Sequence, residues 1–136
     1  MMAKRRHGPH MVGGRPAVAV GHVSLRVGSV AQAESFYRSL GMRPIVTNQG
    51  MAILELRGGT HLLLFRAKGK PRRGAIRTFD LMVDDIPALR KNLLKSGMEV
   101  SALERDARGG HVFFSVEDPD GRLLTLYSSH AGDRDV

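Results

Sequence analysis

The sequence contains no cysteine, no tryptophan and no long apolar run. Without cysteine the protein has no disulfide framework, no thiol nucleophile and no cysteine-bound zinc, and a reducing, cytoplasmic setting fits. A membrane-spanning helix needs roughly 20 apolar residues, and no segment approaches that length. The first ten residues also lack the apolar centre of a secretory signal. We therefore expect a cytoplasmic protein with no membrane partner.

Several catalytic signatures are missing as well. There is no G-x-S-x-G nucleophile elbow, no phosphate-binding glycine loop and no H-E-x-x-H helix. Each of these motifs holds a nucleophile, a nucleotide phosphate or a metal ion in a defined geometry. Hydrolase, NTPase and zincin activities therefore have no support in the sequence.

The formal net charge of +8 is concentrated in two segments. Residues 1–16 hold basic side chains but few apolar ones, so we expect a flexible basic N-terminal tail. Residues 67–77 form a second basic segment, which is typical of a solvated linker. A nucleic-acid accessory role for the tail and linker is the less favoured alternative. The basic residues concerned are Lys4, Arg5, Arg6, Arg15, Arg66, Lys68, Lys70, Arg72, Arg73 and Arg77.

The chain repeats itself. A shift of 56 positions lays residues 22–27 over residues 78–83 and aligns the glycines at 41 and 97. A shift of 62 positions aligns 63–65 with 125–127, as if one loop had grown by six residues. Two long copies indicate a duplicated module rather than a solenoid.

Each copy shows the same order of elements. In the first copy, residues 22–27 alternate polar and apolar side chains, which predicts a strand with one apolar face. A helix follows, with Ser29 as its N-cap and Gly41 after its last turn. Three strands come next, at approximately 43–48, 51–57 and 60–66.

The second copy begins with a predicted strand at 78–83. Its helix is capped by Asp85, carries Pro87 in the first turn and ends at Gly97. Three more strands follow, and the turn Asp118-Pro119-Asp120-Gly121 joins the last two, with proline and glycine in the positions that a tight turn favours.

The predicted fold is therefore α+β, with two tandem βαβββ modules forming curled mixed sheets around a central cavity. One domain is expected over 17–130, because 136 residues is a common single-domain length. Its modules cover about 17–66 and 78–130, joined by the basic linker 67–77. A C-terminal tail occupies 131–136.

Four stretches carry the pattern of the two modules: GHVSLRV, AESFYRSLGMRPI, FDLMVDD and FFSVEDPDGRLLTLY. With these stretches, the arrangement resembles the vicinal oxygen chelate superfamily, which includes glyoxalase I, fosfomycin-resistance transferases, extradiol dioxygenases and bleomycin-binding proteins. The resemblance covers about residues 18–130. Members share a scaffold and differ in chemistry, so the resemblance implies the fold more directly than the activity.

The resemblance also implies where a metal ion would bind. Family ligands come from the first and last strands of each module and fall here on His22, Leu63, Thr78 and Thr125. Only His22 is a useful ligand, whereas such sites usually need three protein donors. We therefore expect no metal cofactor. The alternative is zinc, nickel, manganese or iron held by His22 with unconventional donors such as Asp80 or His61.

The candidate ligand-binding residues lie on the strand face opposite the aliphatic side chains. His22 is also the candidate catalytic residue, since a neutral imidazole can accept a ligand proton if a carboxylate fixes its tautomer. The alternative for His22 is a half-buried structural histidine bonded to Ser24 or Asp80. The full set is His22, Arg26, Thr78, Asp80, Thr125 and Tyr127.

Three functions from different classes follow. The first is a binding protein that holds a small metabolite or antibiotic between the modules without a metal ion. The second is a lyase, isomerase or dioxygenase that uses His22, with or without a metal. The third is the nucleic-acid role of the basic segments. By analogy with the family, we expect a homodimer.

Overall fold

The computed structural model describes residues 11–129. The predictions for Lys4, Arg5, Arg6 and the C-terminal tail 131–136 fall outside this range. Within the predicted N-terminal tail, β1 (Met11–Val12) and β2 (Arg15–Pro16) pair as a short antiparallel hairpin.

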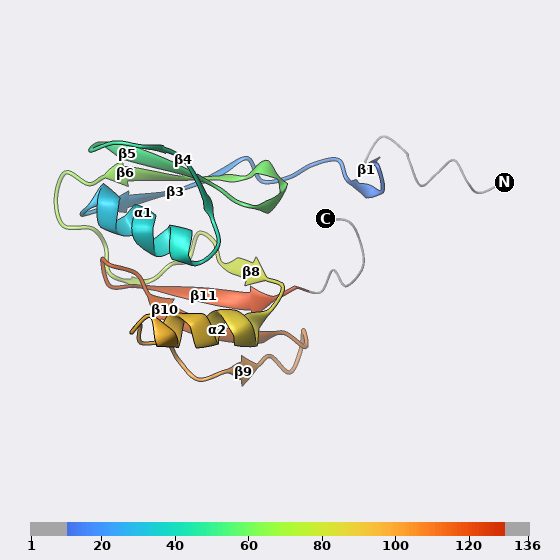
Figure 1. Cartoon of the computed structure of the whole chain (residues 1–136). Coiled ribbons are helices and arrows are strands. Elements are labelled where there is room, and N and C mark those ends of the chain that lie inside the picture. The colour runs from blue at the N-terminus through green and yellow to red at the C-terminus, as the bar shows by residue number, and fades with distance from the viewer. Residues whose placement is uncertain (1–10, 130–136) are drawn as a thin grey trace.

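The first module has the predicted βαβββ order, shown in Figure 1. Its four strands form one sheet in the order β3-β6-β5-β4, in which β3 runs parallel to β6 and the other pairs are antiparallel. The short 3₁₀ turn η2 (Arg57–Gly59) separates the last two strands. The elements are β3 (His22–Val27), α1 (Val30–Ser39), β4 (Arg43–Thr47), β5 (Met51–Glu55) and β6 (His61–Arg66).

The second module repeats this plan. Its first strand again runs parallel to its last, and the last strand also pairs with the linker strand β7 (Gly74–Ala75). The elements are β8 (Leu81–Val83), α2 (Ile86–Lys95), β9 (Glu104–Arg105), β10 (Val112–Glu117) and β11 (Arg122–Ser128). The α+β fold of two curled βαβββ modules is thus confirmed.

The two helices correspond at the predicted offset, since a shift of 56 converts the bounds of α1 into those of α2. Both predicted N-caps are present. Ser29 Oγ accepts a hydrogen bond of 3.2 Å from the Gln32 amide, and Asp85 Oδ1 accepts one of 3.0 Å from the Ala88 amide. Each cap accepts a hydrogen bond from an amide that the helix itself leaves unpaired. The two helices therefore begin at corresponding positions of the two copies.

The first strand of the second module is half as long as predicted. The strand predicted at 78–83 is regular only over 81–83. β7 pairs with the start of β11 and β8 with its end, so residues 78–80 lie between two short ladders. The alternation along 78–83 cannot show where the strand begins, because that depends on how β7 and β8 share one partner strand, β11, far along the chain.

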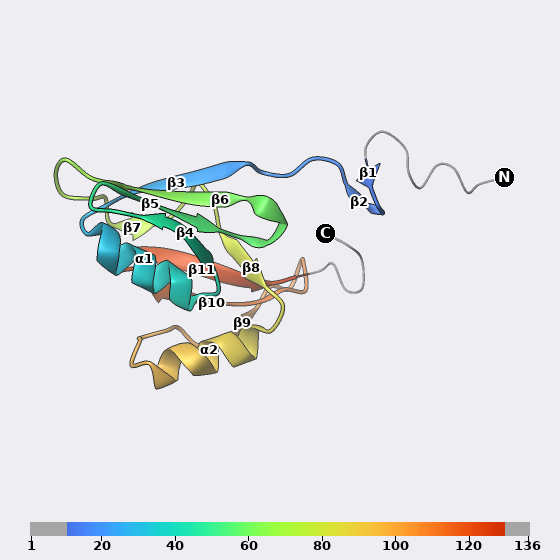
Figure 2. The ribbon, with the colours of Figure 1, turned by 45° about the horizontal axis from the view of Figure 1, so that its top comes forward.

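A single apolar core joins the two modules. Val27, Tyr37, Leu64, Phe114 and Leu126 belong to it, so both sheets and α1 contribute. Figures 1 and 2 show α1 between the first sheet and the second, with α2 packed against the second sheet. Between residues 11 and 129, no helix has the length and apolar character to cross a bilayer.

Candidate functional site

The predicted polar face of β3 is present. His22, Ser24 and Arg26 are exposed, while Val23 and Leu25 pack against the core and Val27 is buried within it. This alternation follows from the two-residue period of a strand, in which successive side chains point to opposite faces. The alternation predicted along residues 22–27 is therefore present.

This face is the side of the first sheet that α1 does not cover. Because α1 lies between the two sheets, the first sheet turns its other face outward (Figures 1 and 2). Thr78 and Asp80 are also exposed, so the chain alone does not enclose the predicted set in a common hollow. Thr125 and Tyr127 are half-buried.

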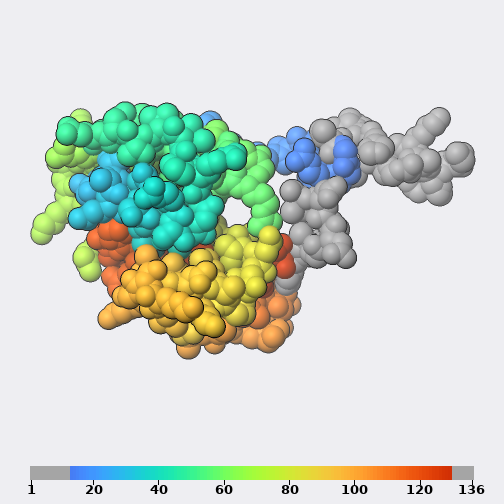
Figure 3. Space-filling model, viewed as in Figure 1, coloured from blue at the N-terminus to red at the C-terminus, as the bar shows by residue number. Residues whose placement is uncertain are grey.

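A pocket of about 430 Å³ does lie between the modules, and Figure 3 shows it as a hollow between the green and yellow segments. Its walls are mainly apolar and include Val23, Met42, Phe79 and Leu126. Of the six predicted site residues, Asp80 alone lines it. The pocket is therefore bordered mainly by core side chains and not by the polar face of β3.

His22 begins a row of polar side chains that crosses the first sheet. It pairs in register with His61, which pairs with Glu55, which pairs with Arg43. The rings of His22 and His61 have centroids 6.0 Å apart, and His61 Nε2 lies 3.3 Å from Glu55 Oε2. The row places two imidazoles and a carboxylate side by side on the exposed face.

The electrostatics of this row centre on Glu55. Arg43 Nε donates a hydrogen bond of 2.9 Å to Glu55 Oε1. This contact with Arg43, assisted by His61, holds the pKa of the Glu55 carboxyl below its ordinary value, although burial opposes the shift. The carboxylate therefore stays ionised and can orient the His61 ring. Glu55 and Arg43 could not be predicted from the sequence, because only the register of β4, β5 and β6 brings them beside His61.

The second module carries a separate polar face. Thr125 Oγ1 lies 3.2 Å from Ser115 Oγ, and the Tyr127 ring contacts the rings of both His111 and Phe113. A shallow pocket of about 510 Å³ is lined by Asp80, Met82, Asp106, His111 and Tyr127. Asp80 and Tyr127 are thus brought together, whereas His22 lies on the face of the other module.

The residues at the family's metal positions do not fit a divalent ion. The carbon side chain of Leu63 supplies no donor, and the neutral hydroxyls of Thr78 and Thr125 are poor ligands. Over the part of the chain that the structure describes, no three histidine or carboxylate side chains gather in a way that could hold a metal. The row that contains His22 also fails this test.

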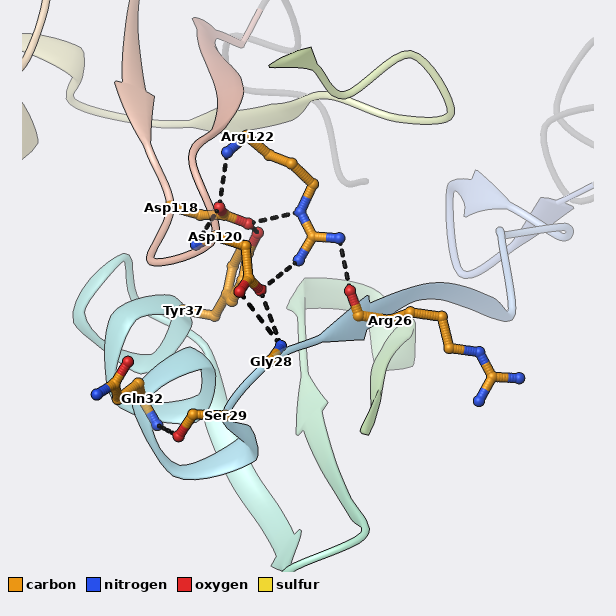
Figure 4. Close-up of polar contacts among 8 residues, drawn as sticks. All are labelled: Arg26, Gly28, Ser29, Gln32, Tyr37, Asp118, Asp120 and Arg122. Carbon is orange, nitrogen blue, oxygen red and sulfur yellow. Dashed lines mark hydrogen bonds and ion pairs between the residues drawn. The ribbon is translucent and has the colours of Figure 1, made fainter. Parts of the chain in front are cut away.

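The turn before β11 docks onto the first module, as Figure 4 shows. Tyr37 donates its hydroxyl hydrogen to Asp118 Oδ2 over 2.9 Å, and Arg122 Nε donates to the same oxygen over 2.9 Å. The amide of Gly28 donates to the Asp120 carboxylate at 3.2 Å. Burial and the adjacent Asp118 carboxylate raise the pKa of the Tyr37 hydroxyl far above its ordinary value, so Tyr37 remains a donor.

This cluster also fixes the polar face of β3. Arg122 Nη1 donates a hydrogen bond of 2.7 Å to the carbonyl oxygen of Arg26. Figure 4 shows the Arg26 side chain extending away from the cluster, and its guanidinium carbon lies 5.0 Å from the centre of the Phe65 ring. The sequence predicted the tight turn but not its docking, which brings Arg26 near the linker and Thr78.

Two βαβββ modules with a helix on one face of each sheet define the vicinal oxygen chelate class of fold. The sequence matches the family model of the Glyoxalase/Bleomycin resistance protein/Dioxygenase superfamily over residues 19–126, and the chain belongs to that superfamily. No curated protein sequence gives a significant match.

Solved structures support the same fold. A lactoylglutathione lyase from Agrobacterium tumefaciens is 19% identical, with a TM-score of 0.68 over 85% of this chain and 96% of that chain. A bleomycin resistance determinant encoded on the transposon Tn5 is 21% identical, with a TM-score of 0.62 over 83% of this chain and 99% of that chain. The oxidase ChaP-H1 is 16% identical, with a TM-score of 0.66 over 85% of this chain and 99% of that chain. These names differ in chemistry, so the likeness extends to the fold alone.

Proposed function

We propose that the protein binds a small metabolite or antibiotic without a metal ion, at a site that two copies of the chain complete. The observation that carries the proposal is the exposed polar face of β3, with His22 at its start and no second metal donor at the family positions. An imidazole without a metal can still accept or donate a hydrogen bond to a ligand.

Association of two copies would convert the two open faces into one enclosed site. The first module offers His22 and the half-buried Leu63 and Phe65, and the second offers the half-buried Tyr127 and the 52% exposed Met82. Exposed apolar side chains beside polar ones are typical of surfaces that bind a partner or ligand. The proposed homodimer therefore places the first module of one copy against the second module of the other.

A second candidate function is enzymatic. The His61–Glu55 pair beside His22 favours a metal-free lyase or isomerase in which an imidazole removes a proton from the bound substrate. A carboxylate bonded to one ring nitrogen of His61 sets the tautomer and leaves the other nitrogen for this task.

Metal analysis of the purified chain tests the proposal. Protein prepared without chelator and without a metal-affinity tag should hold far less than one zinc, nickel, manganese or iron ion per chain. Added divalent ions should not raise its unfolding temperature. One tightly bound ion per chain that His22→Ala removes would overturn the proposal and favour the family's metal-dependent chemistry.

Sedimentation analysis tests the two-copy site. Met82→Glu should shift the protein from dimer to monomer, because it places a charge on a face that the partner would cover. Leu94→Glu is the matched control, since Leu94 is 46% exposed on α2, outside both polar faces. Equal dissociation by both variants, or a monomeric parent protein, would contradict the proposed dimer. A cytoplasmic location remains part of the proposal, and cell fractionation tests it.

A further inference from the structure

A basic pocket lies where the linker crosses the end of β3. It has a volume of about 560 Å³, and its walls include Arg26 from β3 and Lys68, Lys70 and Arg72 from the linker. None of its lining residues is acidic. Within residues 11–129, none of these four cations forms an ion pair with a carboxylate.

The fifth cation of the pocket differs from these four. Arg122 is buried and already bonded to Asp118, Asp120 and the carbonyl of Arg26. Its charge is compensated, so it anchors the wall of the pocket. Arg26 in contrast keeps its guanidinium without a carboxylate partner and held over the ring of Phe65. A cation held in this way loses little conformational freedom when it binds an anion.

Unpaired like charges around one hollow repel each other, and an anion inside the hollow relieves that repulsion. Ser24 and Thr78 also line the pocket and add two hydroxyl donors. Four cations, two hydroxyls and no carboxylate are the groups that bind a phosphate-type oxyanion.

We propose that this pocket binds a phosphate, phosphonate or sulfate group of a small ligand. The rest of the ligand extends along the polar face of β3 from Arg26 toward His22, a placement that rests on the function proposed above. The anion site itself depends only on the linker and the end of β3. The same chemistry would accept a nucleic-acid phosphate, so the test separates the two sources.

Titration of the full chain with inorganic phosphate at constant ionic strength, followed by amide chemical shifts, tests the proposal. Saturable shifts should appear at residues 24–26 and, in the linker, at residues 67–70 and 72. The triple variant Lys68→Gln, Lys70→Gln, Arg72→Gln should weaken phosphate binding by at least about tenfold. Its exposed side chains lie outside the core, and an unchanged unfolding midpoint would show that the fold is intact.

The matched control is Lys91→Gln with Lys95→Gln and Arg38→Gln, which removes the same charge from exposed positions on the helices. It should leave phosphate binding unchanged. Equal weakening by both triple variants, or shifts that never saturate, would overturn the proposal. Binding of a short DNA duplex that is steeply salt-dependent, without saturable phosphate binding, would also overturn it in favour of nucleic acid.

The two proposals fail in different experiments. A stoichiometric metal ion would overturn the proposed metal-free function while phosphate saturation and its loss in the linker variant remain. Loss of phosphate saturation would overturn the anion site while the metal content stays negligible.

Discussion

Tyr37 donates a hydrogen bond of 2.9 Å to Asp118, which lies 81 positions later in the chain. Both residues are buried, with 0% and 5% of their surface exposed. Asp118 also accepts from Arg122 at 2.9 Å, so one carboxylate joins α1 to the start of β11. This contact crosses the boundary between the modules and sets how they sit against each other.

Replacing Tyr37 by phenylalanine should lower the free energy of unfolding by about 1–3 kcal/mol, because the buried carboxylate of Asp118 loses one of its donors. Urea unfolding measures this change. Tyr127→Phe is the control, since the Tyr127 hydroxyl makes no hydrogen bond within the described range. A loss of similar size in the control would show that the effect is not specific to the inter-module contact.

The stabilisation that the Tyr37 hydroxyl provides should be lost in alkali. Burial raises the pKa of Tyr37 in the folded protein above its ordinary value of 10.0. Its contribution is therefore fully present below about pH 10 and is lost as the pH rises toward the folded pKa, because only the unfolded chain ionises readily. Unfolding experiments from about pH 8 to about pH 11 should show the gap between parent and Tyr37→Phe closing with pH. A constant gap would contradict the prediction.

Gly28→Ala should weaken the contact between the modules. A Cβ at Gly28 would lie 2.9 Å from Asp120 Oδ1, an oxygen that the Gly28 amide holds at 3.2 Å. Arg122 Nη2 holds the other oxygen of the same carboxylate at 3.0 Å, so the group cannot move freely. We expect a cost of about 1–3 kcal/mol. In an Asp120→Ala background the cost should nearly vanish, and a double-mutant cycle measures the difference.

The Glu55 carboxylate on the first sheet should make the free energy of unfolding depend on pH in acid. Arg43, and to a smaller extent His61, lower the pKa of Glu55 in the folded protein below its ordinary value of 4.5. The stabilisation is present above that value and is lost as the pH falls through the folded pKa. Glu55→Gln should therefore reduce the acid dependence of unfolding. Glu99→Gln, at an exposed position without an ion pair in the described structure, should leave it unchanged.

The features that repeat locally could be predicted from the sequence. Alternation along 22–27 gave the polar face of β3, and the capping residues Ser29 and Asp85 gave both helix starts. The offset of 56 between the copies reproduced the bounds of α2. Each of these depends on neighbours within a few positions, which a sequence displays directly.

The direction in which the faces point could not be predicted. The alternation of each strand places His22 and Asp80 opposite the apolar side chains. It does not show whether the polar face of the first module meets that of the second. That depends on α1 lying between the sheets, which Tyr37 and Asp118 fix over a long sequence separation. Likewise, Glu55 reaches His61 only through the register of β5 and β6. These relationships arise from tertiary packing.

The long-range contact of the Asp118 turn also bears on synthesis by the ribosome. The first module is translated well before Asp118 and Arg122, yet the Tyr37 hydroxyl that it buries finds its acceptor only in that later turn. A nascent first half therefore leaves one side of α1 uncovered, so it should remain loosely folded on the ribosome until residue 122 has left the exit tunnel.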